Sequence, residues 1–122
     1  MPLSILIADN NVDHAQSLAD VVTLWGHDAF VCFDPSIALD YYEKFWPDVM
    51  LLDIGFPLRS DGLAVARKAR GLTIEKVSTI IAITGHSDDE TRTQAKEAGF
   101  DYYFVKPIDL TKLEVLLIKL NK

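Results

Sequence analysis

The stretch Val49-Met50-Leu51-Leu52-Asp53 decides the fold that this sequence predicts. Its apolar residues follow one another without a polar interruption, and the run ends in a carboxylate. Two similar runs are Ile5-Leu6-Ile7-Ala8, followed by Asp9, and Ile80-Ile81-Ala82-Ile83, followed by Thr84. Short apolar runs without alternation are typical of strands that are covered on both faces, as in a parallel sheet. The sequence therefore predicts a parallel sheet with helices on both of its faces.

The same pattern extends over the whole chain. Strands are expected at Leu3–Ala8, Ala29–Phe33, Val49–Leu52, Thr79–Thr84 and Tyr102–Val105. Helices are expected between and after them: one with the apolar stripe Ala15, Leu18, Ala19 and Val22 that ends at Gly26, one over Pro35–Phe45, one over Asp61–Arg70, one from a capping box at Ser87 to Gly99, and one that Asp109 caps. Short connections of this kind impose right-handed crossovers. The predicted fold class is α/β, a doubly wound (βα)5 domain over residues 1–122 with a parallel five-stranded sheet in the order 2-1-3-4-5.

The composition excludes several classes of partner. The chain has 122 residues, a formal net charge of -6 and one cysteine, Cys32. An acidic surface repels phosphate backbones and anionic lipid headgroups, so neither nucleic acid nor a membrane is an expected partner. One cysteine can form no internal disulfide, and no apolar run approaches the roughly 20 residues of a membrane span. We expect a cytoplasmic protein.

Reactive side chains follow four of the predicted strands. Asp9 and Asn10 follow the first, Asp53 follows the third, Thr84 ends the fourth, and Lys106 follows the fifth. In a doubly wound sheet, ligands bind where the carboxyl ends of the central strands meet. Two neighbouring carboxylates repel each other, and a hard cation such as Mg2+ relieves that repulsion. The pattern predicts a Mg2+ site beside which the lysine and the threonine can contact a phosphoryl group.

Short motifs follow one another along nearly the whole chain. They are Ile5-Leu6-Ile7-Ala8-Asp9-Asn10-Asn11, Leu51-Leu52-Asp53-Ile54-Gly55-Phe56-Pro57, Asp61-Gly62, Ile83-Thr84-Gly85 and Val105-Lys106-Pro107. In this order they resemble the receiver domains of two-component response regulators. Two further segments, Leu24-Trp25-Gly26-His27 and Glu97-Ala98-Gly99-Phe100-Asp101, are similar to the receivers attached to hybrid sensor histidine kinases. Each motif alone is weakly specific, whereas the ordered set is strongly specific.

The resemblance implies a phosphoacceptor domain of two-component or phosphorelay signalling, which is a switch and not an ordinary enzyme. Asp53 would take a phosphoryl group from a histidine kinase or a histidine phosphotransfer protein. Mg2+ would be held by Asp9, Asp53 and the backbone carbonyl of Gly55. Lys106 would contact the phosphoryl group, and Thr84 would move toward it.

Further features of the family fall on residues after Thr84. Tyr103 would change its rotamer together with Thr84, and the peptide bond between Lys106 and Pro107 would be cis. Separately, the apolar residues on more than one face of the last helix suggest that a second copy or an effector binds a surface made of the fourth helix, the fifth strand and the fifth helix.

The chain departs from the family pattern at two places. Asn10 stands where the family most often has a second carboxylate, so weakened or indirect Mg2+ ligation is expected because an amide oxygen carries no net charge. Arg59 lies in a loop that is one residue longer than the common form. It either reaches the phosphorylation site or the donor protein, or is a solvated loop cation.

Each candidate residue also has a simpler interpretation. Asp53 alone could cap a turn, and Tyr103 could be a core aromatic residue whose hydroxyl reaches water. His14 and His27 lack the spacing of metal ligands and are expected at the surface or at helix ends. Cys32 is expected as a small buried hydrophobe.

Apolar residues occupy more than one face of the last helix. Leu113, Leu116, Leu117 and Leu120 are expected to face the sheet. Val115 and Ile118 lie beside that stripe, so the helix either offers apolar surface to a partner or is deeply buried.

Three other functions share parts of this pattern. An aspartyl-nucleophile phosphatase needs a second Asp two residues after the nucleophile, where this chain has Gly55. A flavodoxin-like nucleotide or flavin binder has the same architecture but needs a phosphate-cradling loop after the first strand. The remaining alternative is a degenerate receiver that binds a partner without phosphorylation, which only Asn10 favours.

Overall fold

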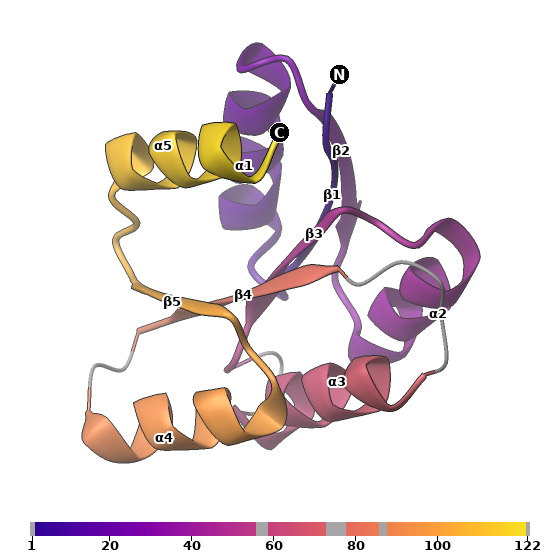
Figure 1. Ribbon diagram of the computed structural model, residues 1–122, viewed down its shortest axis with the longest axis vertical. Coiled ribbons are helices and arrows are strands. Elements are labelled where there is room, and N and C mark those ends of the chain that lie inside the picture. Colours follow the sequence, from indigo (N-terminus) through magenta and orange to yellow (C-terminus); the bar gives the residue numbers. More distant parts are fainter. Residues whose placement is uncertain (1, 56–58, 73–77, 86–87, 122) are drawn as a thin grey trace.

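The computed structural model describes residues 2–55, 59–72, 78–85 and 88–121, and strands alternate with helices throughout these ranges. The elements in chain order are β1 Ser4–Ala8, α1 Val12–Leu24, β2 Asp28–Cys32, α2 Pro35–Phe45, β3 Val49–Asp53, α3 Arg59–Gly71, β4 Thr79–Thr84, α4 Asp89–Ala98, β5 Tyr102–Val105 and α5 Leu110–Leu120. Figure 1 shows their arrangement around one sheet.

The strands form a single five-stranded sheet in the order β2-β1-β3-β4-β5, and every neighbouring pair is parallel. The predicted doubly wound (βα)5 fold is therefore confirmed. Because the strands are parallel, their carboxyl ends lie at one edge of the sheet. The candidate residues at those ends are consequently brought to the same edge.

Helices cover both faces of the sheet (Figure 1). On one face, α1 and α5 pack against side chains such as Ile5, Leu51 and Ile81. On the other face, α2, α3 and α4 pack against side chains such as Leu6 and Met50. Alternate residues of each central strand thus enter different cores, which is why these strands are apolar at every position.

Helix α1 illustrates how the local sequence sets an element. Its buried residues are the predicted stripe, Ala15, Leu18, Ala19 and Val22. The side chain of Asn11 accepts a hydrogen bond from the His14 N–H and caps the first turn. Gly26 follows the helix with a φ of +96°, a left-handed conformation that glycine adopts without steric cost. The chain then turns directly into β2.

Helix α5 packs on the sheet through a narrow stripe. Leu113 and Leu117 are buried, and Leu116 and Leu120 pack partly against them. Val115 and Ile118 are exposed by about 60% of their surface. The alternative of a deeply buried helix is therefore wrong, and α5 leaves apolar side chains exposed.

Two helix starts differ from the predictions. Helix α3 begins at Arg59 and not near Asp61, so the backbone of Arg59 belongs to the first turn of a helix and not to a loop; its side chain lies outside the described part of the structure. Helix α4 is capped by Asp88, whose carboxylate accepts the Thr91 N–H, and not by Ser87. Ser87 itself lies outside the described residues. Asp and Ser are equally good caps, so the sequence could not choose between adjacent candidates.

The described helices include none that is both long enough and apolar enough to cross a bilayer. Cys32 is buried at the end of β2, as predicted, and burial raises the pKa of its thiol to about 12. His27 follows α1 as expected for a helix-end residue, but its side chain is buried. Its Nδ1 accepts a hydrogen bond from the Leu3 N–H at 3.2 Å.

Candidate functional site

The register of the sheet places the candidate residues side by side. Ala8 pairs with Leu52, so Asp9 and Asp53 are the next residues on two adjacent strands. Asp53 pairs with Ile83, the residue before Thr84. Thr84 in turn pairs with Val105, and the Lys106 N–H donates to the Thr84 carbonyl at 2.7 Å. Strand pairing alone therefore brings four separate segments to one edge.

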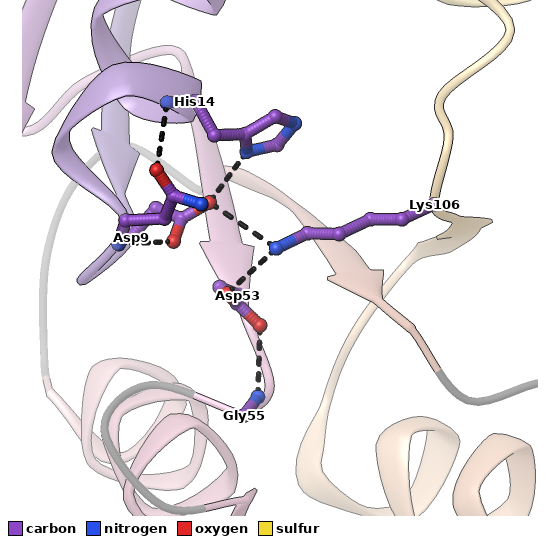
Figure 2. A network of polar contacts seen from close by, with 6 residues as sticks. Asp9, His14, Asp53, Gly55 and Lys106 are labelled. Carbon is purple, nitrogen blue, oxygen red and sulfur yellow. Dashed lines mark hydrogen bonds and ion pairs between the residues drawn. The ribbon is translucent and has the colours of Figure 1, made fainter.

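A network of polar contacts connects these strand ends (Figure 2). The Lys106 ammonium donates to Asp53 Oδ2 at 3.0 Å and lies 3.5 Å from Asp9 Oδ2. The Gly55 N–H donates to Asp53 Oδ1 at 2.9 Å, and the Asn11 N–H donates to Asp9 Oδ1 at 2.9 Å. Both carboxylates are buried. The lysine thus lies between two buried anions.

The other candidate residues lie on, or directly after, strands β1, β4 and β5. Thr84 is fully buried at the end of β4. Asn10 is exposed beside Asp9. Tyr103 lies on β5, half-buried, and its ring packs under the Arg92 guanidinium at 4.6 Å. The bond between Lys106 and Pro107 is cis, the isomer that the resemblance implies.

His14 belongs to the network although the sequence pattern did not single it out. Its Nδ1 lies 2.6 Å from Asp9 Oδ2. His14 is the third residue of α1 after the cap Asn11, and a side chain at that position can reach back toward the chain before the helix, as Glu does in a capping box. The spacing of cap and histidine was therefore the missed signal. The expectation that His14 has only a surface or helix-end role is incomplete.

The electrostatics of the two carboxylates differ. Burial raises the pKa of Asp53, and its hydrogen bond to Lys106 only partly offsets that effect, while the charge of Asp9 raises the pKa further. Burial also acts to raise the pKa of Asp9, but the pKa is lowered overall by hydrogen bonds, first that of the Asn11 N–H and then that of His14, together with the charge of Lys106. For Lys106, burial acts to lower the pKa, but the hydrogen bond and charge of Asp53 prevail and raise it.

Asp53→Asn is expected to stabilise the protein at neutral pH when no divalent cation is present. Because the pKa of Asp53 is raised, ionisation is less favourable in the folded chain than in the unfolded chain, and this destabilises the fold at every pH above the folded pKa. The amide removes that effect and raises the free energy of unfolding on the order of 1 kcal/mol. Urea denaturation measures the change. A gain that persists well below the ordinary Asp pKa of 3.8, or a loss at neutral pH, would contradict this assignment.

The donor set of this edge fits a hard cation that retains water. Among the described residues, no three side chains of His, Cys, Asp or Glu converge as a preformed metal site. Two carboxylates with a backbone oxygen nevertheless match the few protein ligands that Mg2+ takes, since this ion keeps several of its waters. Asp9, Asp53 and the Gly55 carbonyl would hold it, with Asn10 beside them.

Comparison with known proteins places the chain among signalling domains. A family model described as response regulator receiver domain matches residues 5–118. The response regulator MprA of Mycobacterium tuberculosis is 31% identical over 113 residues, which cover 93% of this chain and 48% of MprA. The transcriptional regulatory protein ZraR of Salmonella typhimurium is 27% identical over 117 residues, which cover 96% of this chain and 26% of ZraR. The chain thus spans about a quarter to a half of the length of these relatives.

Solved structures show the same architecture. A CheY-like response regulator receiver domain from Methylobacillus flagellatus superposes with a TM-score of 0.84 at 25% identity, covering 99% of this chain and 100% of the other. The chemotaxis protein CheY4 of Vibrio cholerae superposes with a TM-score of 0.88 at 21% identity, covering 98% and 99% of the two chains. At 21% identity, the similarity to CheY4 supports the fold alone.

Proposed function

This chain belongs to the response regulator receiver domain family, and from that premise we propose that it is a phosphoacceptor switch whose Asp53 takes a phosphoryl group from a histidine kinase or a histidine phosphotransfer protein. The observation that carries the proposal is the position of Lys106 Nζ, 3.0 Å from Asp53 Oδ2 and 3.5 Å from Asp9 Oδ2. A cation fixed beside an anionic acceptor is what transfer of a charged phosphoryl group requires.

Each residue of the site then has a definite role. One carboxylate oxygen of Asp53 attacks phosphorus, the bond from phosphorus to the donor nitrogen breaks, and its electron pair leaves with the donor imidazole. The Gly55 N–H holds the Asp53 carboxylate in place through the other oxygen. Lys106 neutralises charge on the transferring group, and Asp9 keeps the ammonium at this edge through its own charge. Mg2+, when bound, would neutralise further phosphoryl oxygens.

The switch would act at the ends of β4 and β5. Thr84 is buried at the site edge and Tyr103 lies three residues before Lys106. A hydroxyl that shifts toward the phosphoryl group leaves space that an aromatic side chain can enter. The surface of α4, β5 and α5 lies next to this pair, and its exposed residues Val115 and Ile118 fit an effector or a second copy. We place this activity in the cytoplasm, within two-component or phosphorelay signalling.

The proposal is tested with a small acyl phosphate as phosphodonor. After incubation with the donor and Mg2+, intact-mass measurement is expected to show the addition of one phosphoryl group to the wild type. The Asp53→Ala variant is expected to show none. Absence of the adduct on the wild type, or an adduct that survives Asp53→Ala, would favour a degenerate receiver that acts without phosphorylation.

Asn10→Asp is expected to tighten Mg2+ binding. The new carboxylate adds a formal charge beside Asp9, where the amide of Asn10 supplies only a dipole, and an increase of about tenfold in affinity follows. Titration calorimetry with Mg2+ measures it. Asn121→Asp, at the end of α5, changes the net charge equally and serves as the control. Equal affinities of Asn10→Asp and the wild type would show that position 10 does not influence the ion.

A further inference from the structure

The oxygens of Asp9 are already occupied by donors from the chain itself. Oδ1 accepts the Asn11 N–H at 2.9 Å. Oδ2 lies 2.6 Å from His14 Nδ1 and 3.5 Å from Lys106 Nζ. The imidazole is therefore the nearer of the two donors to Oδ2, and it makes the shortest contact of the network around the two carboxylates.

The fold holds His14 in this position. Asn11 caps α1 by accepting the His14 N–H at 3.0 Å, so the residue that donates its own N–H to Asp9 Oδ1 also fixes the histidine backbone. Since a carboxylate only accepts, His14 Nδ1 carries the hydrogen whether the ring is neutral or charged. Figure 2 shows the other ring nitrogen pointing away from Asp9. The contact needs no change of protonation to form or to break.

We propose that His14 is an internal competitor for the metal: its imidazole occupies the Asp9 oxygen that Mg2+ needs, and the ion binds Asp9 only when the ring turns away. The inference rests on the proposed function, because it concerns the same Mg2+ site. It explains how the carboxylate of Asp9 stays satisfied in a buried position next to Asp53. It also assigns the histidine a positioning role, because it acts through Asp9.

A groove beside His14 can accommodate the imidazole when it leaves Asp9. The His14 side chain is 29% exposed. It lines a groove of about 510 Å³ between α1 and the segment that follows β5, whose other walls include Val21, Pro107 and Ile108. Because His14 already lines this groove, a rotation about its side-chain bonds would take the imidazole away from Asp9 without a movement of the helix. The competition can therefore end by a rotamer change alone.

His14→Leu tests the competition because leucine keeps much of the volume and donates no hydrogen bond. Mg2+ affinity, measured by titration calorimetry, is expected to rise about five- to tenfold over the wild type, since the ion no longer displaces a hydrogen bond to a carboxylate. Gln16→Leu makes the same loss of polarity on an exposed position of the same helix and is expected to leave the affinity unchanged. Unchanged or weaker Mg2+ binding by His14→Leu overturns the inference.

Nitrogen-15 NMR spectra of the histidine rings provide a second measurement. If His14 only packed against its neighbours, its ring nitrogen signals would not respond to Mg2+. His14 Nδ1 is expected to show the signal of a protonated nitrogen that shifts on saturation with Mg2+. His27 is an internal control, because its Nδ1 accepts the Leu3 N–H near the amino ends of β1 and β2, whereas the candidate site lies at the carboxyl ends. Its ring signals are expected to stay in place. A His14 signal that ignores Mg2+ overturns the inference.

Two outcomes separate this inference from the proposed function. If the wild type and His14→Leu bind Mg2+ equally and Asp53 still accepts the phosphoryl group, only the inference falls. If neither protein binds Mg2+, both the inference about His14 and the proposed Mg2+ site are wrong. Mn2+ gives a further arm: weaker Mn2+ binding by His14→Leu than by the wild type would make the imidazole a ligand and not a competitor, which also overturns the inference.

Discussion

Replacing Lys106 with methionine slows phosphoryl transfer to Asp53 by about 100-fold or more. Methionine keeps an unbranched side chain only one atom shorter and removes the charge that lies 3.0 Å from Asp53 Oδ2. Among the residues that the structure describes, Lys106 is the only one with a cationic side chain that contacts Asp53. A fixed charge at the acceptor stabilises the developing phosphoryl charge more than water does, because it needs no reorganisation. The rate of adduct formation with a small acyl phosphate measures the loss.

Binding of Mg2+ is expected to respond differently to the same change. Without the ammonium, the repulsion between the Asp9 and Asp53 carboxylates is no longer partly neutralised, and Mg2+ can neutralise it instead. Lys106→Met is therefore expected to bind Mg2+ at least as tightly as the wild type. Lys96→Met, on an exposed position of α4, controls for a general loss of charge. If transfer to Lys106→Met proceeds at the wild-type rate, the assigned role of Lys106 is wrong. If its Mg2+ affinity falls, the two carboxylates do not act on the ion as proposed.

Gly62→Ala destabilises the fold by about 3 kcal/mol. A Cβ at this position would lie 2.7 Å from the Asp53 carbonyl oxygen and 2.7 Å from Ile54 Cα. Both contacts are with backbone, which cannot move aside as a flexible side chain can. Helix α3 therefore packs on the end of β3 only because this residue has no side chain. The substitution must displace either the helix or the strand end that carries Asp53.

Urea denaturation measures that loss, and the rate of adduct formation is expected to fall with it. Gly71→Ala is the matched control, because a Cβ on this last residue of α3 meets nothing within 4 Å. Its stability is expected to stay within about 0.5 kcal/mol of the wild type. Equal stability of the two variants would show that the close approach of α3 to β3 is not required.

The fold could be predicted because its signals are local and redundant. The apolar runs at β1, β3 and β4 each required cover on both faces, and the stripe from Ala15 to Val22 matched the buried face of α1. Boundaries were harder, because competing caps stand side by side at Ser87 and Asp88. The contacts of Arg70 were also missed: its guanidinium donates to the carbonyls of Ser78 and Gly99. Such contacts depend on which helices become neighbours.

The candidate site, like the fold, includes residues that the sequence predicted and features that it did not. Asp9, Asp53 and Lys106 could be expected together because strand ends in a parallel sheet converge, and the structure links them. His14 was missed because its role depends on the direction of a side chain in the first turn of α1. The opposite pKa shifts of Asp9 and Asp53 could not be predicted either. They depend on burial and on which carboxylate oxygen each hydrogen-bond donor reaches.

The most direct test of the account is to locate the phosphoryl group. After reaction with a small acyl phosphate and Mg2+, borohydride reduces an aspartyl phosphate to homoserine, and peptide mass analysis identifies the residue. The account predicts homoserine at position 53 in the wild type and at no position in Asp53→Ala. Homoserine at position 9, or a phosphoryl group found on a histidine, would contradict it.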